Sequence, residues 1–562
     1  MASSLSRKLL ISLGVVVSVL AIVFVNRFAL ITWAASHGAM GYLASLSEPV
    51  LPSQAVNWQQ SEPASNPQEQ RPPNVIVILA DDLGWNDISF YGGGLGGGVV
   101  KTPNIDRIAS EGVHFSNGYA GNATCAPSRA AMLTGRYPTR YGFEFTPAPA
   151  SMMKMAQSFE SHREEPNPSM FFEESLADFP DFREQGVPVS EIFLPEILAS
   201  QDYHSLILGK WHLGEDEGQA PTDRGFDEFL GFLGGAAMFA EFDDPNAVKS
   251  IQEYDPIDLF IWPNLLFSVR YNKEQHFTPD EYMTDYLSTQ AVRAIEANKH
   301  RPFFMYLSYN APHTPLHATK ADYDALPMIA NHTERVYGAM MLALDRGIGR
   351  VMAALESAGI DDNTLVIFSS DNGGAHYVGL PELNAPYRGW KMTFFEGGTH
   401  VPFFMRWPGT IEAGSEYPRP VTHTDIFTTA AAAAGAALPN DRVIDGVDLM
   451  PYLDGTREDD PHEAIFWRTG TYRAVRAGDW KLQLSDPDET PFLYNLALDP
   501  TEQLNLAATE KDQLQRLKGL INEGMSDWSA PLRPPLVAGP NYPDKHLNEP
   551  LDKDDELVYW YN

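Results

Sequence analysis

Asn74–Gly84 reads NVIVILADDLG, an apolar run that ends in two aspartates. Val75–Ala80 is continuously apolar and rich in β-branched residues, which is typical of a strand buried on both faces of a parallel sheet. Similar runs follow at Ser205–Leu208, Phe303–Leu307, Leu365–Phe368 and Val401–Met405. Helical patterns lie between them, at Tyr282–Ala297 and Glu334–Gly359. This alternation predicts an α/β fold with a large, mostly parallel central sheet sandwiched by helices.

The pattern changes after about residue 455. Short strand-like runs follow one another at Ala464–Trp467, Tyr472–Arg476, Trp480–Leu484 and Phe492–Asn495, before a helical segment at Glu510–Met525. We therefore expect a main domain over residues 74–455 and a C-terminal subdomain over residues 456–525, built from an antiparallel sheet and one helix. Residues 526–562 are Pro-rich and acidic, and are expected to form a tail along the surface.

The composition excludes some partners. A formal net charge of −34 argues against nucleic acid, because phosphate binding needs a basic surface, and it disfavours adsorption to anionic lipid. The chain of 562 residues has one cysteine, Cys125, so no intramolecular disulfide can form.

The N-terminus has the pattern of an export signal. Arg7 and Lys8 precede the apolar run Leu9–Val25, and a second apolar stretch, Phe28–Ala35, follows. Residues 1–36 are expected to be an uncleaved signal anchor or a cleaved signal peptide, and residues 37–73 a solvated linker. The folded part would then lie on the periplasmic or extracellular side, with membrane contact through the N-terminal segment only.

Oxygen-bearing side chains follow two of the expected strands directly. Asp81 and Asp82 end the first, and Asp371 and Asn372 follow Leu365–Ser370. Because the carboxyl ends of parallel strands meet at one sheet edge, these groups would repel one another unless a cation lies among them. Such hard donors favour Ca²⁺, then Mg²⁺ or Mn²⁺, over zinc. Taken alone, either pair is more typical of a turn or a helix N-cap than of a metal site.

The most specific motif surrounds the single cysteine. Residues 125–136 read CAPSRAAMLTGR. A lone cysteine is more often a small buried hydrophobe than a nucleophile. Here, however, the run resembles the full signature of Cys-type sulfatases, C-x-P-S-R followed by x-x-x-L-T-G-R. The resemblance implies that a formylglycine-generating maturation enzyme oxidises Cys125 to Cα-formylglycine, whose hydrate attacks the sulfate ester.

Further motifs resemble the same family in the same order along the chain. They are Ala80–Gly84, Thr102–Gly112, Gly209–Gly214, Ala311–His313, Ser370–Gly374, Arg388–Lys391 and Glu396–Gly398. The resemblance extends from Asn74 to about Ala507. It implies an alkaline phosphatase-like fold.

The resemblance also assigns roles, position by position. The cation would be held by Asp81, Asp82, Asp371, Asn372 and an oxygen of matured Cys125.

Around the transferred sulfate, Arg129 and His212 would orient the formylglycine hydrate and take a proton during sulfate release. Lys210, His313 and Lys391 would bind the sulfate oxygens. His313 and Lys391 would also help to protonate the departing alkoxide.

The function implied is that of an arylsulfatase-type sulfuric ester hydrolase acting on an aryl or carbohydrate sulfate. Two alternatives stay open: a phosphonate monoester or phosphodiester hydrolase of the same superfamily, and a membrane-tethered, non-catalytic binding protein. No expected catalytic position is missing, which favours the sulfatase. Two irregular insertions, residues 152–187 and 239–275, are expected to shape substrate specificity. His423 is interpreted as a structural histidine.

Overall fold

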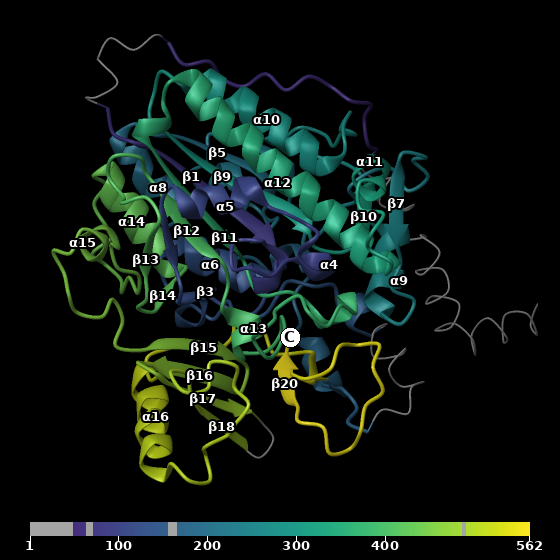
Figure 1. Cartoon of the computed structure of the whole chain (residues 1–562), viewed down its shortest axis with the longest axis vertical. Coiled ribbons are helices and arrows are strands. Elements are labelled where there is room, and N and C mark those ends of the chain that lie inside the picture. Colours follow the sequence, from purple (N-terminus) through teal and green to yellow (C-terminus); the bar gives the residue numbers. More distant parts are fainter. Residues whose placement is uncertain (1–48, 63–70, 155–165, 486–489) are drawn as a thin grey trace, which may run out of the picture.

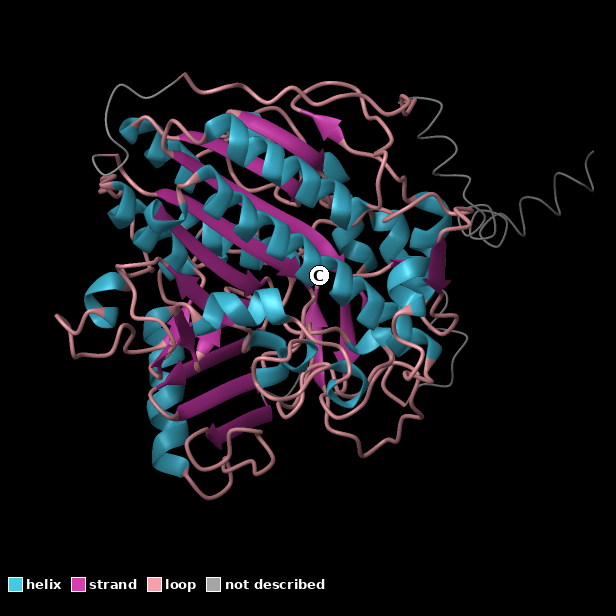
Figure 2. Ribbon diagram, turned by 45° about the horizontal axis from the view of Figure 1, so that its top comes forward, coloured by secondary structure: helices cyan, strands magenta, loops and turns pink. Residues whose placement is uncertain are grey.

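The computed structural model describes residues 49–62, 71–154, 166–485 and 490–562. Its centre is a nine-stranded mixed sheet in the order β13-β2-β12-β11-β1-β9-β5-β6-β8. The five inner strands run parallel: β11 (Thr364–Ser370), β1 (Asn74–Asp81), β9 (Phe303–Pro312), β5 (His204–Lys210) and β6 (Glu228–Phe232). The predicted α/β fold with a mostly parallel sheet is confirmed (Figures 1 and 2).

Helices cover both faces of this sheet (Figure 1). One face carries α5 (Pro103–Ser110), α10 (Met283–Asn298) and α12 (His332–Ala358). The other carries α6 (Cys125–Thr134), α8 (Leu194–Leu198) and α14 (Thr424–Ala434). Because strand side chains alternate, Ile76 and Ile78 enter the first core and Val75 and Val77 the second. This double burial explains the continuous apolar run in β1.

The outer strands are short. They are β2 (Val113–Phe115), β8 (Arg270–Tyr271), β12 (Phe403–Arg406) and β13 (Ser415–Tyr417). Two small pairs lie beside the sheet: β3 (Gly118–Tyr119) with β14 (Val421–Thr422), and β7 (Ala247–Ser250) with β10 (Leu316–Thr319). Further helices of the described residues are α4 (Leu95–Gly98), α9 (Pro256–Asn264), α11 (Lys320–Asp324), α13 (Glu396–Thr399) and α15 (Met450–Leu453).

The small antiparallel sheet predicted near the C-terminus is also present. It consists of β15 (Ile465–Thr469), β16 (Tyr472–Ala477), β17 (Trp480–Ser485) and β18 (Thr490–Asn495). Helix α16 (Lys511–Gly524) packs on it through Leu514, Leu517 and Ile521. The sheet and its helix lie below the large domain in Figure 1.

Residues 526–562 differ from the surface tail expected for them. They form β19 (Val537–Asn541) and β20 (Val558–Tyr561), which join β4 (Met170–Phe171) in a three-stranded sheet. Val558 and Trp560 are buried in a cluster with Phe394 and Tyr472. The buried aromatic residues of this acidic segment therefore pack it against the body of the protein.

Residues 49–62 of the expected linker are mostly exposed, but two of their side chains are buried. Residues 49–62 run along α10 (Figure 1), where Trp58 is only 5% exposed and donates a 3.1 Å hydrogen bond to Gln290. Val56 enters the same core. Among the described residues, no helix is both long and apolar enough to cross a membrane. The apolar run Leu9–Val25 lies outside the described residues.

Candidate active site

Cys125 is the first residue of α6, and its side chain faces the carboxyl end of β1. Every residue of α6 is buried, and Cys125 itself is 2% exposed. Its Sγ lies 3.8 Å from Oδ1 of Asp82. Burial alone would raise the pKa of this thiol, but the positive charges of Lys210 and Lys391 outweigh it and lower the pKa. The position therefore favours a negatively charged group.

The structure brings the four predicted oxygen-bearing residues to one sheet edge. Strands β1 and β11 are paired in parallel with Ala80 opposite Ser370, so the residues that follow each strand lie side by side. The backbone N–H of Asp82 donates to Oδ1 of Asp371 at 3.1 Å, and Nδ2 of Asn372 donates to Oδ1 of Asp82 at 2.8 Å. Asp81, Asp371 and Asn372 have no exposed surface.

Each of the three carboxylates has a cationic partner. Lys210 Nζ lies 2.7 and 2.9 Å from the two oxygens of Asp81.

Arg129 Nε donates to Asp371 at 2.8 Å, and Lys391 Nζ lies 2.8 Å from Asp82. Burial would raise the pKa of Asp82, but Lys391 and His313 outweigh it, so that this pKa is held well below its ordinary value. Burial raises the pKa of Asp371 to about 6 although Arg129 opposes this shift. The edge therefore holds acidic and basic side chains in alternating contact.

These residues fit a hard divalent cation. The amide oxygen of Asn372 is buried and has no hydrogen-bond partner among the described residues. Asp81, Asp82, Cys125 and His313 each offer one ligand atom, all within 4.8 Å of one another. His313 joins this group although the sequence analysis assigned it to the substrate. The oxygen of Asp371 nearest Arg129 is already engaged by that guanidinium.

The pKa values of the two predicted histidines shift in opposite directions. His212 is buried, and its Nδ1 has no hydrogen-bond partner in the part of the chain that the structure describes. Burial and the charges of Lys210 and Arg129 lower its pKa well below the ordinary value. His313 Nε2 lies 3.3 Å from Lys391 Nζ and 3.5 Å from Asp82. Burial would lower the pKa of His313, but the nearby carboxylates outweigh it and raise the pKa. Such a split suits one proton acceptor and one donor.

The backbone at His212 is in the left-handed region, with φ of 62°. Its ring lies against Gly235, where a Cβ atom would come within 2.8 Å of ring atoms. Glycine at position 235 therefore makes room for the imidazole.

Three residues of the site escaped the sequence analysis. Tyr306 and Ser308, which alternate along β9, both accept hydrogen bonds from Arg129 Nη1, the first at 3.1 Å. Side chains alternate between the two faces of β9, and this alternation is the signal that could have identified Tyr306 and Ser308. Tyr377 donates to Asp82 Oδ2 at 2.7 Å. Nothing in its local sequence marks it, because the contact joins two separate loops.

His423 lies behind the site. It is buried between Ser128 of α6, at 3.2 Å, and Ser369 of β11, at 2.9 Å. Burial and the charge of Arg129 lower its pKa to about 3, so the ring is neutral. It joins the helix of Cys125 to the strand of Asp371, which agrees with a structural histidine.

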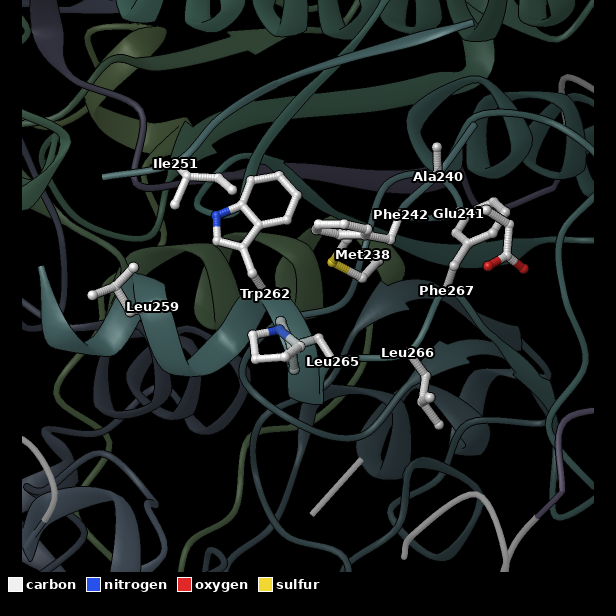
Figure 3. Close-up of a pocket in the computed structure, with 11 residues that line it drawn as sticks. Met238, Ala240, Glu241, Phe242, Ile251, Leu259, Trp262, Leu265, Leu266 and Phe267 are labelled. Carbon is white, nitrogen blue, oxygen red and sulfur yellow. The ribbon is translucent and has the colours of Figure 1, made fainter. Parts of the chain in front are cut away.

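The insertion 239–275 lies beside the site, where Tyr254 donates a hydrogen bond to the carbonyl of Val378. It contains α9 and an apolar recess of about 470 Å³, lined by Met238, Phe242, Trp262, Leu266 and Phe267 among others (Figure 3). Trp262 also donates a 2.9 Å hydrogen bond to Asp258, a buried carboxyl. Burial raises the pKa of Asp258 to about 6, and its hydrogen bonds and the charge of His313 only partly offset this shift.

Comparison with known proteins gives one consistent family. Residues 73–436 match the family model described as Sulfatase. N-acetylgalactosamine-6-sulfatase of Homo sapiens is 32% identical over 493 residues, which cover 81% of this chain and 85% of that protein. Steryl-sulfatase of Mus musculus is 28% identical, covering 84% and 85%.

Among solved structures, the complex of Ps i-CgsB with k-i-k-neocarrahexaose superposes with a TM-score of 0.67 and 30% identity, covering 82% of this chain and 95% of that one. The motifs, the fold and these similarities agree. The chain therefore belongs to the sulfatase family and is a sulfuric ester hydrolase.

Proposed function

We propose that this chain hydrolyses sulfate monoesters by covalent catalysis, with Cys125 matured to Cα-formylglycine as the nucleophile and Ca²⁺ as the cation. One observation carries the proposal. Cys125 begins a fully buried helix and faces Asp82, at the point where Lys210, Lys391 and His313 converge. A nucleophile surrounded by cationic side chains is what the transfer of an anionic group requires.

The cation would be held by Asp81, Asp82, Asp371 and Asn372, with an oxygen of matured Cys125. Carboxylate and amide oxygens are the donors that Ca²⁺ prefers, and Mg²⁺ or Mn²⁺ fit less well. A bound cation would neutralise charge on the sulfate oxygens. It would also offset the mutual repulsion of three buried carboxylates.

The hydrated aldehyde would supply one hydroxyl whose oxygen attacks sulfur and then carries the sulfate. Deprotonation of the second hydroxyl would re-form the aldehyde and expel sulfate together with the first oxygen. Lys210 and Lys391 would bind the sulfate oxygens, and Arg129 would fix the orientation of the nucleophile. His313 in its protonated form would donate a proton to the leaving alkoxide. His212, held neutral, would accept a proton during sulfate release.

As substrate we propose a sulfated carbohydrate. The support comes from the relatives: one is named N-acetylgalactosamine-6-sulfatase and another is bound to a carrahexaose, both at 30% identity or above. Steryl-sulfatase shows that the family also includes an enzyme named for a steroid substrate. A panel of sulfated sugars and aryl sulfates, compared by kcat/KM, tests this choice.

We also propose that the N-terminal segment directs export and that the folded part works on the periplasmic or extracellular side. The support is the charge and hydropathy pattern of residues 1–36. A formylglycine-generating enzyme would be the maturation partner.

The decisive experiment is mass spectrometry of the tryptic peptide Ile108–Arg129 from protein made with a formylglycine-generating enzyme. We expect the aldehyde at Cys125, with Cys125→Ala protein as the unmodified, inactive control. A persistent thiol in active protein would refute the proposed nucleophile.

Turnover of two model substrates distinguishes the sulfatase function from the two alternative functions. An aryl sulfate should be turned over faster than an aryl phosphodiester, whereas the reverse order would favour the phosphodiesterase alternative. Folded protein that carries the aldehyde but turns over neither substrate would favour a binding function.

A further inference from the structure

Tyr377 connects two residues that the proposed mechanism uses for different tasks. Its hydroxyl donates to Asp82 Oδ2 at 2.7 Å and accepts from Lys391 Nζ at 3.0 Å. Asp82 is a proposed cation ligand, and Lys391 is a proposed sulfate-binding group. One phenol therefore contacts both partners of the direct Lys391–Asp82 ion pair.

We propose that Tyr377 is a positioning residue for sulfate ester hydrolysis, and that the C-terminal segment 543–556 holds it in place. The inference rests on the proposed roles of Asp82 and Lys391. Tyr377 would keep Oδ2 of Asp82 occupied by a hydrogen bond, so that Oδ1, which faces Cys125, stays directed at the cation site.

The second contact acts on Lys391. A lysine side chain is flexible, and its ammonium presents three donors. Here Nζ has Asp82, Tyr377 and His313 as neighbours, at 2.8, 3.0 and 3.3 Å. Removing the phenol oxygen would leave one direction of the ammonium without a partner in a buried place, and Lys391 would lose its fixed position.

Tyr377 lies on a loop that has little regular structure of its own. Only a short 3₁₀ turn, His376–Val378, interrupts residues 373–395. The side chain of Asn384 closes this loop internally, through bonds with Gly374 and Gly389. The part of the loop that carries Tyr377 is therefore held in position by contacts with residues outside the loop.

Those contacts come from the C-terminal segment and from the insertion. The backbone N–H of Leu547 donates to the carbonyl of His376 at 3.1 Å, directly before Tyr377. From the opposite side, Tyr254 donates to the carbonyl of Val378 at 3.0 Å. The residues on both sides of Tyr377 are thus held by chain segments far away in sequence.

The far end of the loop is held by the same C-terminal segment. Gly389 N–H donates to the carbonyl of Pro543 at 3.1 Å. Arg388 pairs with Asp544 at 2.6 Å and with Glu556 at 2.5 Å. Because Lys391 follows two residues after Gly389, these contacts also restrict the position of the Lys391 ammonium.

The first test is Tyr377→Phe, which removes only the hydroxyl. We expect kcat for an aryl sulfate to fall by about 10- to 100-fold, the usual effect of losing a hydrogen bond behind a metal ligand. Calorimetric titration should show a weaker affinity for Ca²⁺. Tyr387→Phe is the matched control, because the same atom is lost from the same loop and Tyr387 contacts Trp85 and His400 instead.

The inference is overturned if Tyr377→Phe protein keeps the wild-type kcat and Ca²⁺ affinity, whatever its melting temperature. Failure of the proposed function would be seen separately. In that case wild-type protein would lack formylglycine at Cys125, whereas failure of this inference leaves the aldehyde content and wild-type turnover intact.

The second test concerns the C-terminal segment. The double variant Asp544→Asn/Glu556→Gln removes both carboxylates from Arg388, and Asp554→Asn removes an exposed acid of the same segment as a control. We expect faster amide hydrogen exchange at residues 376–389 and a lower kcat in the double variant only. Unchanged exchange and kcat would refute the role of this segment.

Discussion

Arg129 and Asp371 form an ion pair that is completely removed from water. Arg129 Nε donates to Asp371 Oδ2 at 2.8 Å, Nη2 lies 2.7 Å from the same oxygen, and neither side chain has exposed surface. The pair joins the helix of Cys125 to the strand that ends at the proposed cation ligands. It therefore links the proposed nucleophile to the proposed cation site through one buried contact.

We expect Arg129→Met to reduce the free energy of unfolding by about 3–5 kcal/mol, because Asp371 remains as an uncompensated buried charge. Urea denaturation in EDTA measures this without a contribution from bound metal. The double variant Arg129→Met/Asp371→Asn should recover part of the loss. Simple addition of the two single losses would show that the residues are not coupled.

Calcium should stabilise the protein. At a concentration 100 times the dissociation constant, a ligand that binds only the folded state adds about 2.7 kcal/mol. We expect Ca²⁺ to raise the melting temperature of EDTA-treated protein more than Mg²⁺ does. Asn372→Leu should abolish the shift, because it removes a buried, unpartnered amide oxygen. Exposed Asp362 provides the control variant Asp362→Asn, which should keep it.

His313 is predicted to act as the acid for the leaving group. If so, His313→Gln should lower kcat by about 10²–10⁴-fold for an alkyl or sugar sulfate, whose alkoxide needs a proton. The loss should be much smaller for 4-nitrophenyl sulfate, whose leaving group is stable as an anion. His114→Gln, outside the site, is the control. Equal losses for both substrates would assign His313 to sulfate binding alone.

His462 should make stability depend on pH. Its Nε2 lies 2.9 Å from both oxygens of buried Asp425, and this carboxylate outweighs the effect of burial and raises the pKa of His462 above 6.5. A raised pKa in the folded state means that the stabilisation is complete below pH 6.5 and is lost as the pH rises through the folded-state pKa.

Thermal unfolding of His462→Gln protein should show a flatter stability curve above pH 6.5 than the wild type. An identical slope in the two proteins would remove His462 as its origin.

Trp560 tests whether the C-terminal strands belong to the core. Its indole is 4% exposed and packs on Phe394 and Tyr472, with ring centroids 5.2 and 6.3 Å away. We expect Trp560→Ala to cost about 3–5 kcal/mol in unfolding free energy. Leu532, which is 52% exposed, should tolerate the change to alanine with little effect. Equal tolerance at both positions would mean that the segment is held elsewhere.

Much of this protein could be predicted from local patterns. Apolar runs such as Val75–Ala80 predict strands buried on both faces, because a strand in the middle of a parallel sheet meets helices above and below. The Asp pair after β1 and the motif that begins at Cys125 predicted which residues gather at the carboxyl edge. These residues can be identified from the sequence because each motif is contiguous along the chain.

Only the tertiary structure decides which of these charges meet. Lys210 pairs with Asp81 and Lys391 with Asp82, although 129 and 309 residues separate the partners. Tyr377 enters the site by the same kind of contact.

The burial of strand β20 and of Trp58 in segment 49–62 also depends on residues that are distant in sequence. In an acidic, Pro-rich segment, neither period nor composition indicates that a few aromatic side chains will find an apolar surface. Sequence patterns record the periodicity of one element at a time, whereas these contacts arise from burial shared between elements that become neighbours only when the chain folds.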